Sequence, residues 1–507
     1  KKINIIKERR LSDHQITNST EVISTRESET HGIRDAYEIL QQIESVVVTS
    51  TNWGKQNVTI RGSNSNEVAV YLDGMKLNSS IDGIANLAFI DMSLLENIEV
   101  IKGGNSILFG PGNFGGVILL NSKSNKTNNI KLNRTFGITD NNDQDLNGRI
   151  ILNVGPTSFE NNYSVKNRMY DGRTLHTSVY KNNSLSIDYP LFNTTIRTLN
   201  IDNTLAYPSG FMLTADNMLI NRLEMNLNST LIGNWYILGG SKHWNLSDDF
   251  FSNINRKIDD KSNLIKIGKE IVFNRFSGKL QYEIETDSYK SIQNISDPYS
   301  EKTWIDKGEL SHNDFGYAGI LKYSVNVLSK QIEIIRWEMG IRKSKSSYDH
   351  WQNVTHFNNS IMLDDTNYIF KSEKPLYTFK LGSYIFGDLI NSKYELFFNQ
   401  GYNYRNPTLN DQLLWNTTKT FNDQININKK SLNQEYLGST ELNLNIYREI
   451  NDNPINSFIL GASIFRNSFL DKIYYIQLEE NLIAPTNRNQ AWINGMETSI
   501  KWNAFNS

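Results

Sequence analysis

The chain has 507 residues, of which 38% are hydrophobic, and 52 Lys and Arg oppose 54 Asp and Glu to give a formal net charge of -2. This balance, without a long run of either sign, argues against a nucleic-acid partner. The absence of cysteine excludes disulfides, thiolate metal sites and cysteine nucleophiles, and no apolar stretch reaches the roughly 18 residues of a transmembrane helix.

Residues 1–30 are predicted to be an N-terminal segment. They are polar and lack hydrophobic periodicity, and the start "KKINIIKERR" has no apolar core of the kind that a signal peptide needs. We therefore expect an exported form of this chain to be mature or trimmed. A short amphipathic helix is expected next, because Ala36, Ile39, Leu40 and Ile43 fall on one face of a helical period.

Residues 31–125 predict a small mixed α/β domain. Runs rich in β-branched residues at 46–49, 58–60 and 68–72 are separated by Gly, Asn and Ser, and indicate strands. The dipeptide Asp73-Gly74 is a strong signal for a two-residue hairpin turn. A helical turn is expected at "DMSLLEN", followed by a strand at "IEVIKG".

Residues 110–115 spell G-P-G-N-F-G, which matches the G-x-G-x-x-G fingerprint of a dinucleotide loop. Such a loop must open a helix whose N–H groups meet the pyrophosphate. Here it leads into "GVILLNSK", which has strand character, and Pro111 removes one donor. We therefore reject nucleotide binding and expect these glycines, with Gly103, Gly104 and Gly116, to permit tight turns and close backbone contacts.

From about residue 126 the pattern changes to long alternating strands. Apolar and polar residues alternate at 279–285, 336–342 and 441–446. A soluble β-sandwich, with its apolar face inward, is left open by this pattern alone. Long polar links such as "TDNNDQDLNG" and "NNSIMLDDTN", together with Tyr and Trp near strand ends, favour a transmembrane β-barrel.

No residue spacing indicates catalysis or a metal centre. Asp143 to Gly148 begins like a calcium-binding loop, but Val154 stands where an EF-hand needs a bidentate Glu, so an EF-hand is rejected. A looser calcium site is left open beside the simpler alternative of a solvated turn. The seven histidines are scattered, and we predict no enzyme, no catalytic residue, no cofactor and no metal site.

Three segments of the first domain carry a family pattern: "DAYEILQQIESVVV", "VTIRGSNSNEVAVYLDGMKLN" and "LLENIEVIKGGNSILFGPGNFGGVILLNSK". Their order and spacing over residues 33–123 resemble the plug of TonB-dependent outer-membrane receptors. Three later segments, "GYNYRNPTLNDQLLW", "SLNQEYLGSTELNL" and "NGMETSIKW", resemble barrel segments of that family. The second of these has Asn433-Gln434 where the family has Lys-Pro.

The resemblance implies an all-β transmembrane antiparallel β-barrel over residues 126–507, with an α/β plug domain at 31–125 inside its lumen. Residues 1–30 would hold the periplasmic segment with the TonB box. Plugged transporters have 22 strands, whereas residues 126–507 would hold about 15 to 19 at roughly 20 to 25 residues each. The chain also stops at "KWNAFNS", without the family's aromatic-terminated last strand. We therefore expect the last barrel strands to be missing from this sequence.

The resemblance further implies TonB-dependent active import of a scarce nutrient across the bacterial outer membrane, namely an iron–siderophore, cobalamin or similar chelate. Chain size and the short plug favour the cobalamin- and small-siderophore-type receptors. The alternatives are a secreted or surface β-rich carbohydrate-binding protein and a nucleotide-dependent enzyme. The implied partners are TonB with ExbB and ExbD in the periplasm, a small metal chelate as ligand, and outer-membrane lipid around a monomeric barrel.

By the same resemblance, the ligand would bind on plug loops 49–56 and 78–86, with solvated turns as the alternative. The expected ligand contacts are Trp53, Lys55, Gln56, Ser80, Ile81 and Asp82. Arg61, Glu99 and Lys102 would make charged contacts within the plug and to the barrel. The full set of expected plug-motif residues is Arg61, Gly62, Asp73, Gly74, Glu99, Lys102, Gly103, Gly110, Gly115 and Gly116. The TonB contact is expected in "INIIKE", at Ile3, Ile5 and Ile6.

Overall fold

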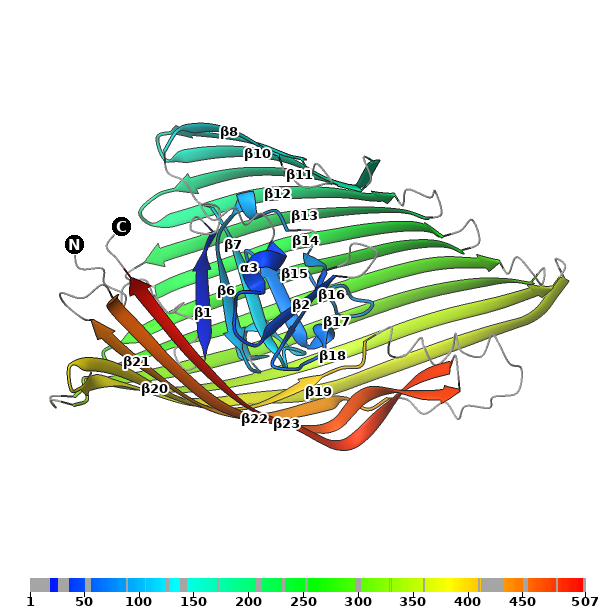
Figure 1. Ribbon diagram of the computed structural model, residues 1–507. Helices are drawn as coiled ribbons and strands as arrows, with labels where there is room; N and C mark the ends of the chain where they lie inside the picture. The colour runs from blue at the N-terminus through cyan, green and yellow to red at the C-terminus, as the bar shows by residue number, and fades with distance from the viewer. Residues whose placement is uncertain are drawn as a thin grey trace.

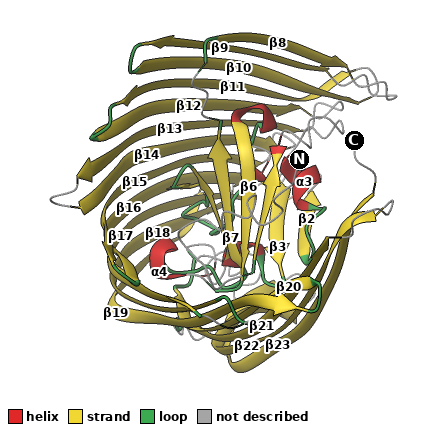
Figure 2. Cartoon of the chain, turned by 90° about the vertical axis from the view of Figure 1, so that its left-hand side faces the viewer, coloured by secondary structure: helices red, strands yellow, loops and turns green. Residues whose placement is uncertain are grey.

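The computed structural model describes residues 19–25, 36–50, 56–87, 90–104, 106–123, 127–136, 144–170, 173–206, 212–229, 233–250, 254–296, 302–327, 329, 331–358, 361–408, 411, 432–449, 455–479 and 482–504. They form a small five-stranded sheet, here called the plug sheet, and a large curved sheet of sixteen strands, here called the wall. The wall curves around the plug sheet and its neighbouring helices, collectively the plug (Figures 1 and 2).

The plug sheet has the order β1-β6-β7-β4-β5. Its central pair β4 and β7 is parallel, and the other pairs are antiparallel. β4 is buried along its whole length, as a strand that is covered on both faces must be. The strand bounds are β1 (Thr20–Ser24), β4 (Val68–Leu72), β5 (Met75–Lys76), β6 (Leu95–Lys102) and β7 (Gly116–Ser122). The plug sheet therefore begins within residues 1–30, which were predicted from the sequence to be an N-terminal segment outside the plug.

A separate hairpin and four short helical segments complete the described part of the plug. The hairpin pairs β2 (Val46–Ser50) with β3 (Gln56–Ile60), and the helical segments are α3 (Ala36–Leu40), η1 (Ser65–Glu67), η3 (Met92–Leu94) and α4 (Ser106–Phe109). The predicted face of Ala36, Ile39, Leu40 and Ile43 is confirmed as buried, although the helix itself ends at Leu40. No helix among the described residues has the length and apolar character needed to cross a membrane.

The predicted turn between β4 and β5 is also confirmed. Asp73 and Gly74 have φ angles of 48° and 86°, which is the left-handed pair that a two-residue hairpin requires. The Asp73 carboxylate accepts a hydrogen bond of 3.0 Å from the Ser122 backbone N–H. The turn is thereby fixed to the end of β7.

The wall strands follow one another in chain order, each antiparallel to the next, with β8 and β23 at the edges. Residues 144–148 and 361–367, which the sequence suggested as parts of polar links, extend strands instead. The strands are β8 (Asn129–Phe136), β9 (Gln144–Val154), β10 (Thr157–Tyr170), β11 (Arg173–Asp188), β12 (Phe192–Ala206), β13 (Met212–Ser229), β14 (Gly233–Phe250), β15 (Ile254–Phe273), β16 (Phe276–Ser296), β17 (Lys302–Asn326), β18 (Ile334–Asn358), β19 (Ile361–Leu389), β20 (Ser392–Arg405), β21 (Glu435–Glu449), β22 (Ile455–Glu479) and β23 (Leu482–Ala504).

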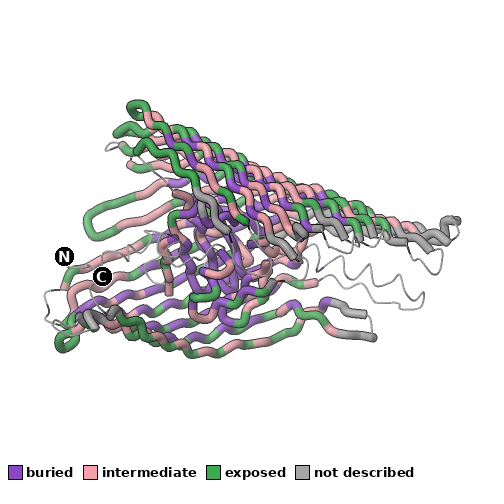
Figure 3. Tube along the Cα trace, turned by 45° about the horizontal axis from the view of Figure 1, so that its top comes forward, coloured by how far each residue is buried: buried purple, intermediate pink, exposed green. Residues whose placement is uncertain are grey.

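The alternation along the wall places apolar side chains outward and charged ones inward. In β18, Met339 and Ile341 are 55% and 60% exposed, whereas Glu338 and Arg342 are 2% and 1% exposed. Buried residues gather around the plug (Figure 3). A soluble sandwich would have the opposite arrangement, so the wall is a transmembrane β-barrel sheet whose outer surface faces lipid.

One side of the plug shares an apolar core with the wall. Plug residues such as Val70 and Ile118 belong to the same buried cluster as Leu199, Ile220 and Leu238 of β12, β13 and β14. This contact seats the plug against β11–β15. The side that faces β16–β23 is instead rich in polar and charged contacts, and the candidate site lies there.

Candidate functional site

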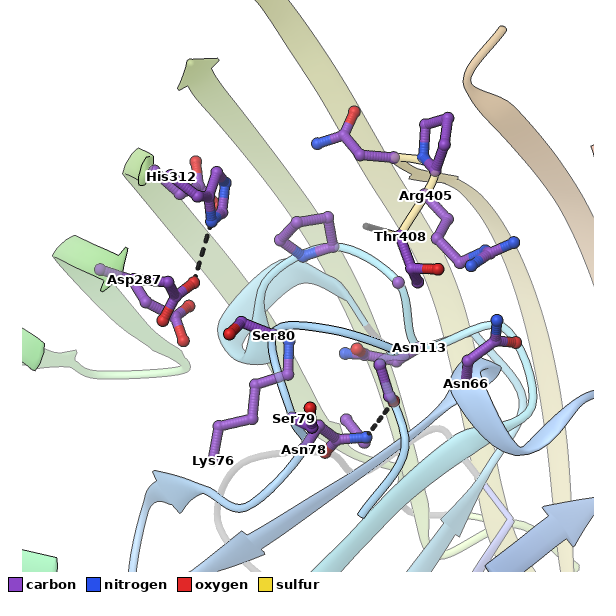
Figure 4. A pocket seen from close by; sticks show the side chains of 18 of the residues that line it. Asn66, Lys76, Asn78, Ser79, Ser80, Asn113, Asp287, His312, Arg405 and Thr408 are labelled. Atoms are coloured by element: carbon purple, nitrogen blue, oxygen red, sulfur yellow. Dashed lines mark hydrogen bonds and ion pairs between the residues drawn. The ribbon is translucent and has the colours of Figure 1, made fainter. Parts of the chain in front are cut away.

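A cavity of about 120 Å³ lies between the plug and the wall (Figure 4). We call it the interface cavity. The plug lines it with residues from 66–83 and 111–113, and the wall with β16, β17 and the chain that follows β20. Its polar or charged lining residues are Asn66, Lys76, Asn78, Ser79, Ser80, Asn113, Glu285, Asp287, His312, Asp314, Arg405, Asn406 and Thr408.

Asn78 holds the plug loop that borders the cavity. Its side-chain amide donates to the carbonyls of Val68 (2.8 Å) and Gly83 (2.7 Å), and its Oδ1 accepts from the Val70 N–H at 2.9 Å. Gly83 has a φ of +70° and donates its N–H to the Ser79 carbonyl. The loop therefore folds back on β4, which fixes the position of Ser79 and Ser80 at the cavity (Figure 4).

The opposite rim is an ion pair on the inner face of the wall. Asp287 of β16 and His312 of β17 are cross-strand neighbours, with 2.9 Å between Oδ2 and Nδ1. The other ring nitrogen of His312 lies 3.0 Å from Ser346 Oγ on β18. Both ring nitrogens thus have partners, so the imidazole is held in one orientation toward the cavity (Figure 4).

A second charged cluster closes the cavity at the end of β20. Arg405 is ion-paired with Glu435 of β21 and lies 3.4 Å from Asp411. Asp411 also accepts a 2.8 Å hydrogen bond from the Thr408 N–H. The two carboxylates neutralise Arg405 and tie the segment that carries Thr408 to the wall.

α4 packs against the wall farther along β16 and β17, toward the β15–β16 turn. Ile107 and Leu108 contact Ala318 and Ile320 of β17. Gln281 of β16 donates a 3.0 Å hydrogen bond to the Leu108 carbonyl. α4 thus occupies the space next to the interface cavity along the inner wall.

Arg61 and Lys102 join the plug to the acidic inner face of β21–β23. The Arg61 guanidinium lies 2.6 Å from Glu441 and 2.7 Å from Glu497, and it stacks on the Phe465 ring at 4.3 Å. Lys102 lies 3.7 Å from Glu497. Arg61 also has a φ of +53°, an uncommon conformation for a residue other than glycine.

Asp73 forms a contact of the opposite polarity on the other side of the plug. Its carboxylate is ion-paired with Arg197 of β12 and accepts from the Ser122 hydroxyl at 2.5 Å. Burial raises the pKa of Asp73, but Arg197, Arg222 and the Ser122 hydrogen bonds outweigh this effect and hold its pKa below the usual range. The plug is therefore held by an anionic turn on one side and a cationic pair on the other.

The described residues among the predicted ligand contacts have different surroundings. Ser80 lines the interface cavity and hydrogen-bonds to Asp260 of β15 at 2.5 and 3.2 Å. Ile81 packs on an apolar cluster of the wall, and Asp82 accepts a hydrogen bond from the Ile84 N–H. Gln56 begins β3 and does not line the cavity. Two predicted ligand contacts, Trp53 and Lys55, lie outside the described residues. So do the predicted TonB contacts Ile3, Ile5 and Ile6.

The predicted motif residues lie within the plug. Glu99 is buried on β6. Five of the glycines, Gly62, Gly74, Gly103, Gly110 and Gly116, have positive φ angles. At Gly115 a side chain would run into Ser63, and at Gly116 into the Ile101 carbonyl. These contacts support the expectation that the glycines permit turns and close backbone approach.

Most residues of the interface cavity were not predicted from the sequence. On the wall, the inward alternation of Glu283, Glu285 and Asp287 was a usable signal, because residues two apart on a strand share a face. On the plug, Asn66 and Asn113 carry no such signal, since their place at the cavity depends on how separate loops meet.

Comparison with known proteins identifies the plug and the fold. The family model described as the TonB-dependent receptor plug domain matches residues 12–117. The vitamin B12 transporters BtuB of two Vibrio vulnificus strains, CMCP6 and YJ016, are each 33% identical, over 106 and 102 residues. Each match covers 20% of this chain and 17% of the relative.

Solved structures match over nearly the whole chain. The hemophore receptor HasR of Serratia marcescens superposes with a TM-score of 0.75 at 14% identity, covering 97% of this chain and 80% of HasR. The ferric yersiniabactin uptake receptor FyuA of Yersinia pestis gives a TM-score of 0.72 at 12% identity, with coverages of 96% and 76%. At such low identity these similarities concern the fold.

Proposed function

Since this chain belongs to the TonB-dependent receptor family and lies in the bacterial outer membrane, we propose that it imports a scarce nutrient as a chelate. The substrate would be an iron–siderophore, cobalamin or a similar metal complex. The observation that carries the proposal is a plug inside the curved wall, with a polar cavity where the two meet. Binding there places a ligand in contact with both parts at once.

Ligand binding must be coupled to the position of the plug for transport to occur. A ligand that touches Ser79 or Asn113 on the plug and Asp287 on the wall has different contacts once the plug shifts. Such differential affinity is what any coupling between two states requires. The apical loops 49–56 and 78–86 remain the predicted source of further ligand contacts.

The pull would come from TonB in the periplasm, energised through ExbB and ExbD, on the segment with Ile3, Ile5 and Ile6. Force on that segment reaches β1 first among the described elements, because β1 comes first in the chain, and in the described plug sheet this edge strand pairs with β6 alone. Glu21 on β1 is ion-paired with Lys102 at 3.0 Å. Removing β1 would therefore leave Lys102 with Glu497 alone, beside the Arg61 contact, and loosen the plug on that side.

The alternative of a secreted carbohydrate-binding protein is disfavoured. Its strands would bury their apolar faces, whereas residues such as Met339 and Ile341 face outward on this wall. The family consists of receptors and transporters, and the proposed function involves no catalytic step.

Uptake by whole cells tests the proposal. Cells that express the full-length receptor are given radiolabelled cyanocobalamin, a set of ferric siderophores, haemin and copper, with and without TonB. We expect one of these to accumulate only when both receptor and TonB are present. Equal accumulation in cells that lack TonB, for every compound taken up, would contradict energised import.

A further inference from the structure

The inner wall at the interface cavity carries two neighbouring cross-strand pairs of opposite character. Asp287 of β16 opposes His312 of β17, and the next inward pair along the same strands is Glu285 opposite Asp314. Directly opposed side chains on one face of an antiparallel pair have Cβ atoms about 5 Å apart, and like charges there repel. The first pair is therefore complementary, whereas the second places two carboxylates side by side at the cavity.

Asp314 is buried and lacks a donor for one oxygen. The residue is 2% exposed, and its Oδ1 has no hydrogen-bond partner among the described residues. Its Oδ2 lies 3.9 Å from Arg342, which is closer to Glu283, at 3.3 Å. A buried carboxylate oxygen without a donor is energetically unfavourable, so the site is incomplete as it stands.

The neighbouring cations do not complete it. His312 is engaged by Asp287, and Arg405 by Glu435 and Asp411. Lys266 lies 3.2 Å from Glu283, which is also ion-paired with Arg342. Lys76 alone reaches the cavity from the plug without an ion pair to a described residue (Figure 4). Neither carboxylate therefore has a close cation of its own among the described residues: Lys76 lines the same cavity, Arg342 lies 3.9 Å from Asp314, and the nearby His312 is held by Asp287.

The geometry favours an organic cation over a bare metal ion. No set of three or more His, Asp or Glu side chains among the described residues converges as a metal site would. The donors that Asp314 lacks can instead come from an ammonium or guanidinium group, which carries several N–H bonds and a positive charge. A cavity of about 120 Å³ has room for such a group and not for a whole chelate.

We propose that Glu285 and Asp314 form a subsite that receives a cationic ammonium or guanidinium group of the transported molecule. This inference rests on the proposed import function and narrows its substrate to molecules that carry such a group. The bulk of the chelate would lie outside the cavity, toward the plug loops. Entry of the cation relieves the repulsion between the two carboxylates, so occupancy of the cavity is favoured only for a substrate of this charge.

The test exploits the absence of cysteine from the chain. A single thiol is introduced by Ser79→Cys, which changes only one side-chain atom on the plug rim of the cavity. The purified full-length receptor, with any cysteine outside these 507 residues replaced by serine, is treated with 2-aminoethyl or 2-sulfonatoethyl methanethiosulfonate, two small reagents of opposite charge. The reaction rate of the cationic reagent is divided by that of the anionic reagent. This ratio is then divided by the same ratio measured with free 2-mercaptoethanol, which corrects for the different reactivities of the two reagents. We expect the cationic reagent to be favoured by about tenfold or more, as one nearby unscreened negative charge would produce.

Two further variants assign the preference to the subsite. Asp314→Asn and Glu285→Gln, each in the Ser79→Cys background, should lower the ratio at least threefold. Asp259→Asn should leave it unchanged, because Asp259 of β15 contacts His243 of β14 and Lys261, and it lies on the strand face opposite to Asp260, which hydrogen-bonds to the plug. Asp314→Asn should also keep or raise the thermal midpoint, since it removes one of two repelling charges.

Several outcomes would overturn the proposal. A rate ratio near one would mean that the two carboxylates share a proton and so carry less charge. A preference for the anionic sulfonate reagent, or no reaction with either reagent, would also contradict the proposal. A clear fall in the thermal midpoint of Asp314→Asn would show that Asp314 serves only as a partner of Arg342. Because labelling requires no transport, a failed uptake experiment leaves this result standing, and a failed labelling experiment leaves TonB-dependent uptake standing.

Discussion

At the scale of single residues, Arg61 shows how a short motif depends on distant parts of the chain. Its side chain and that of Glu441 are 2% and 5% exposed, and the two residues are 380 positions apart. A buried guanidinium with two carboxylates is favourable only while all partners remain. The plug and the wall are therefore linked by an interaction whose loss leaves charges stranded.

Replacing Arg61 with Met should destabilise the folded receptor by about 3–5 kcal/mol, because Glu441 and Glu497 would remain buried without their cation. Urea unfolding of the reconstituted protein measures the change. Lys501→Met is the matched control, since Lys501 is 58% exposed beside Glu21 and an exposed pair contributes about 1 kcal/mol or less. Adding Glu441→Gln and Glu497→Gln to the Arg61 variant should recover part of the loss; a further decrease would refute this account.

Asp73 gives a residue-scale prediction that depends on pH. Because Arg197 and Ser122 hold the Asp73 pKa below its usual range, its contribution to stability is present above the unfolded-state pKa of about 3.9 and is lost as the pH falls through the folded-state pKa. Asp73→Asn should therefore make the plug easier to digest above about pH 5 and leave it unchanged in strong acid. Acid-stable pepsin and a neutral protease measure this digestion. A difference that persists in acid would exclude the charge as its cause.

At the scale of elements, β7 has no room for a side chain at its first residue. Gly116 opens β7 between Lys102 of β6 and Val68 of β4, and its φ is 151°. A side chain there would meet the carbonyl of Ile101. The glycine-rich segment that resembles a nucleotide loop is thus a packing device within the plug sheet.

Gly116→Val should destabilise the plug by about 1–3 kcal/mol or more, as overpacking of a tight contact does. Uptake should fall with it, whereas calorimetry should detect no nucleotide binding in either form. Gly239→Ala on β14 is the control, because a Cβ at that position meets no atom within 4 Å. Normal plug stability and uptake in the Gly116 variant would contradict the assigned role.

At the scale of the whole molecule, the plug meets the wall through its main apolar core along β11–β15 and through a mixture of charged, polar and smaller apolar contacts along β16–β23. Its core is continuous with β11–β15, while Arg61, Lys102 and the interface cavity face β16–β23. Apolar contact is lost in proportion to area, whereas ion pairs can be exchanged for ligand or water contacts. We therefore expect the plug to loosen first along β16–β23.

The outward apolar surface of the wall makes a prediction about the whole fold. Met339→Arg places a charge on the lipid face, so it should weaken folding into bilayers by about 2–4 kcal/mol at mid-membrane depth. The same change on a water-exposed surface would cost about 0.5 kcal/mol or less. Ser288→Arg is the control, because Ser288 is exposed on β16 ten residues beyond Gly278, which lies level with Met339 across β17. This is roughly 33 Å along the strand, outside an apolar band of about 25 Å centred near Met339. Equal folding of both variants into bilayers would argue against a lipid-facing wall.

The sequence by itself determined the local structure and the class of fold. The helix face at Ala36 and Ile39, the Asp73-Gly74 turn and the alternation around Met339 are set by neighbouring residues, so each could be predicted. The plug motifs likewise allowed the family to be predicted. Of the predicted ligand contacts, Ser80 lines the interface cavity. All of these contacts were placed on plug loops 49–56 and 78–86, so the wall residues of the cavity were not predicted.

Only the tertiary structure decided which distant residues meet. The partnership of Arg61 with Glu441, the opposition of Glu285 and Asp314, and the meeting of Asn113 with the β16–β17 wall depend on strand register and on how the plug sits in the lumen. Alternation predicts that Glu285 faces inward. The same alternation fits β16 and β17 shifted by any even number of residues, so it does not show which residue of β17 lies opposite Glu285. The chemistry of the cavity therefore arises from the pairing of whole strands and from the placement of the plug, which no local pattern encodes.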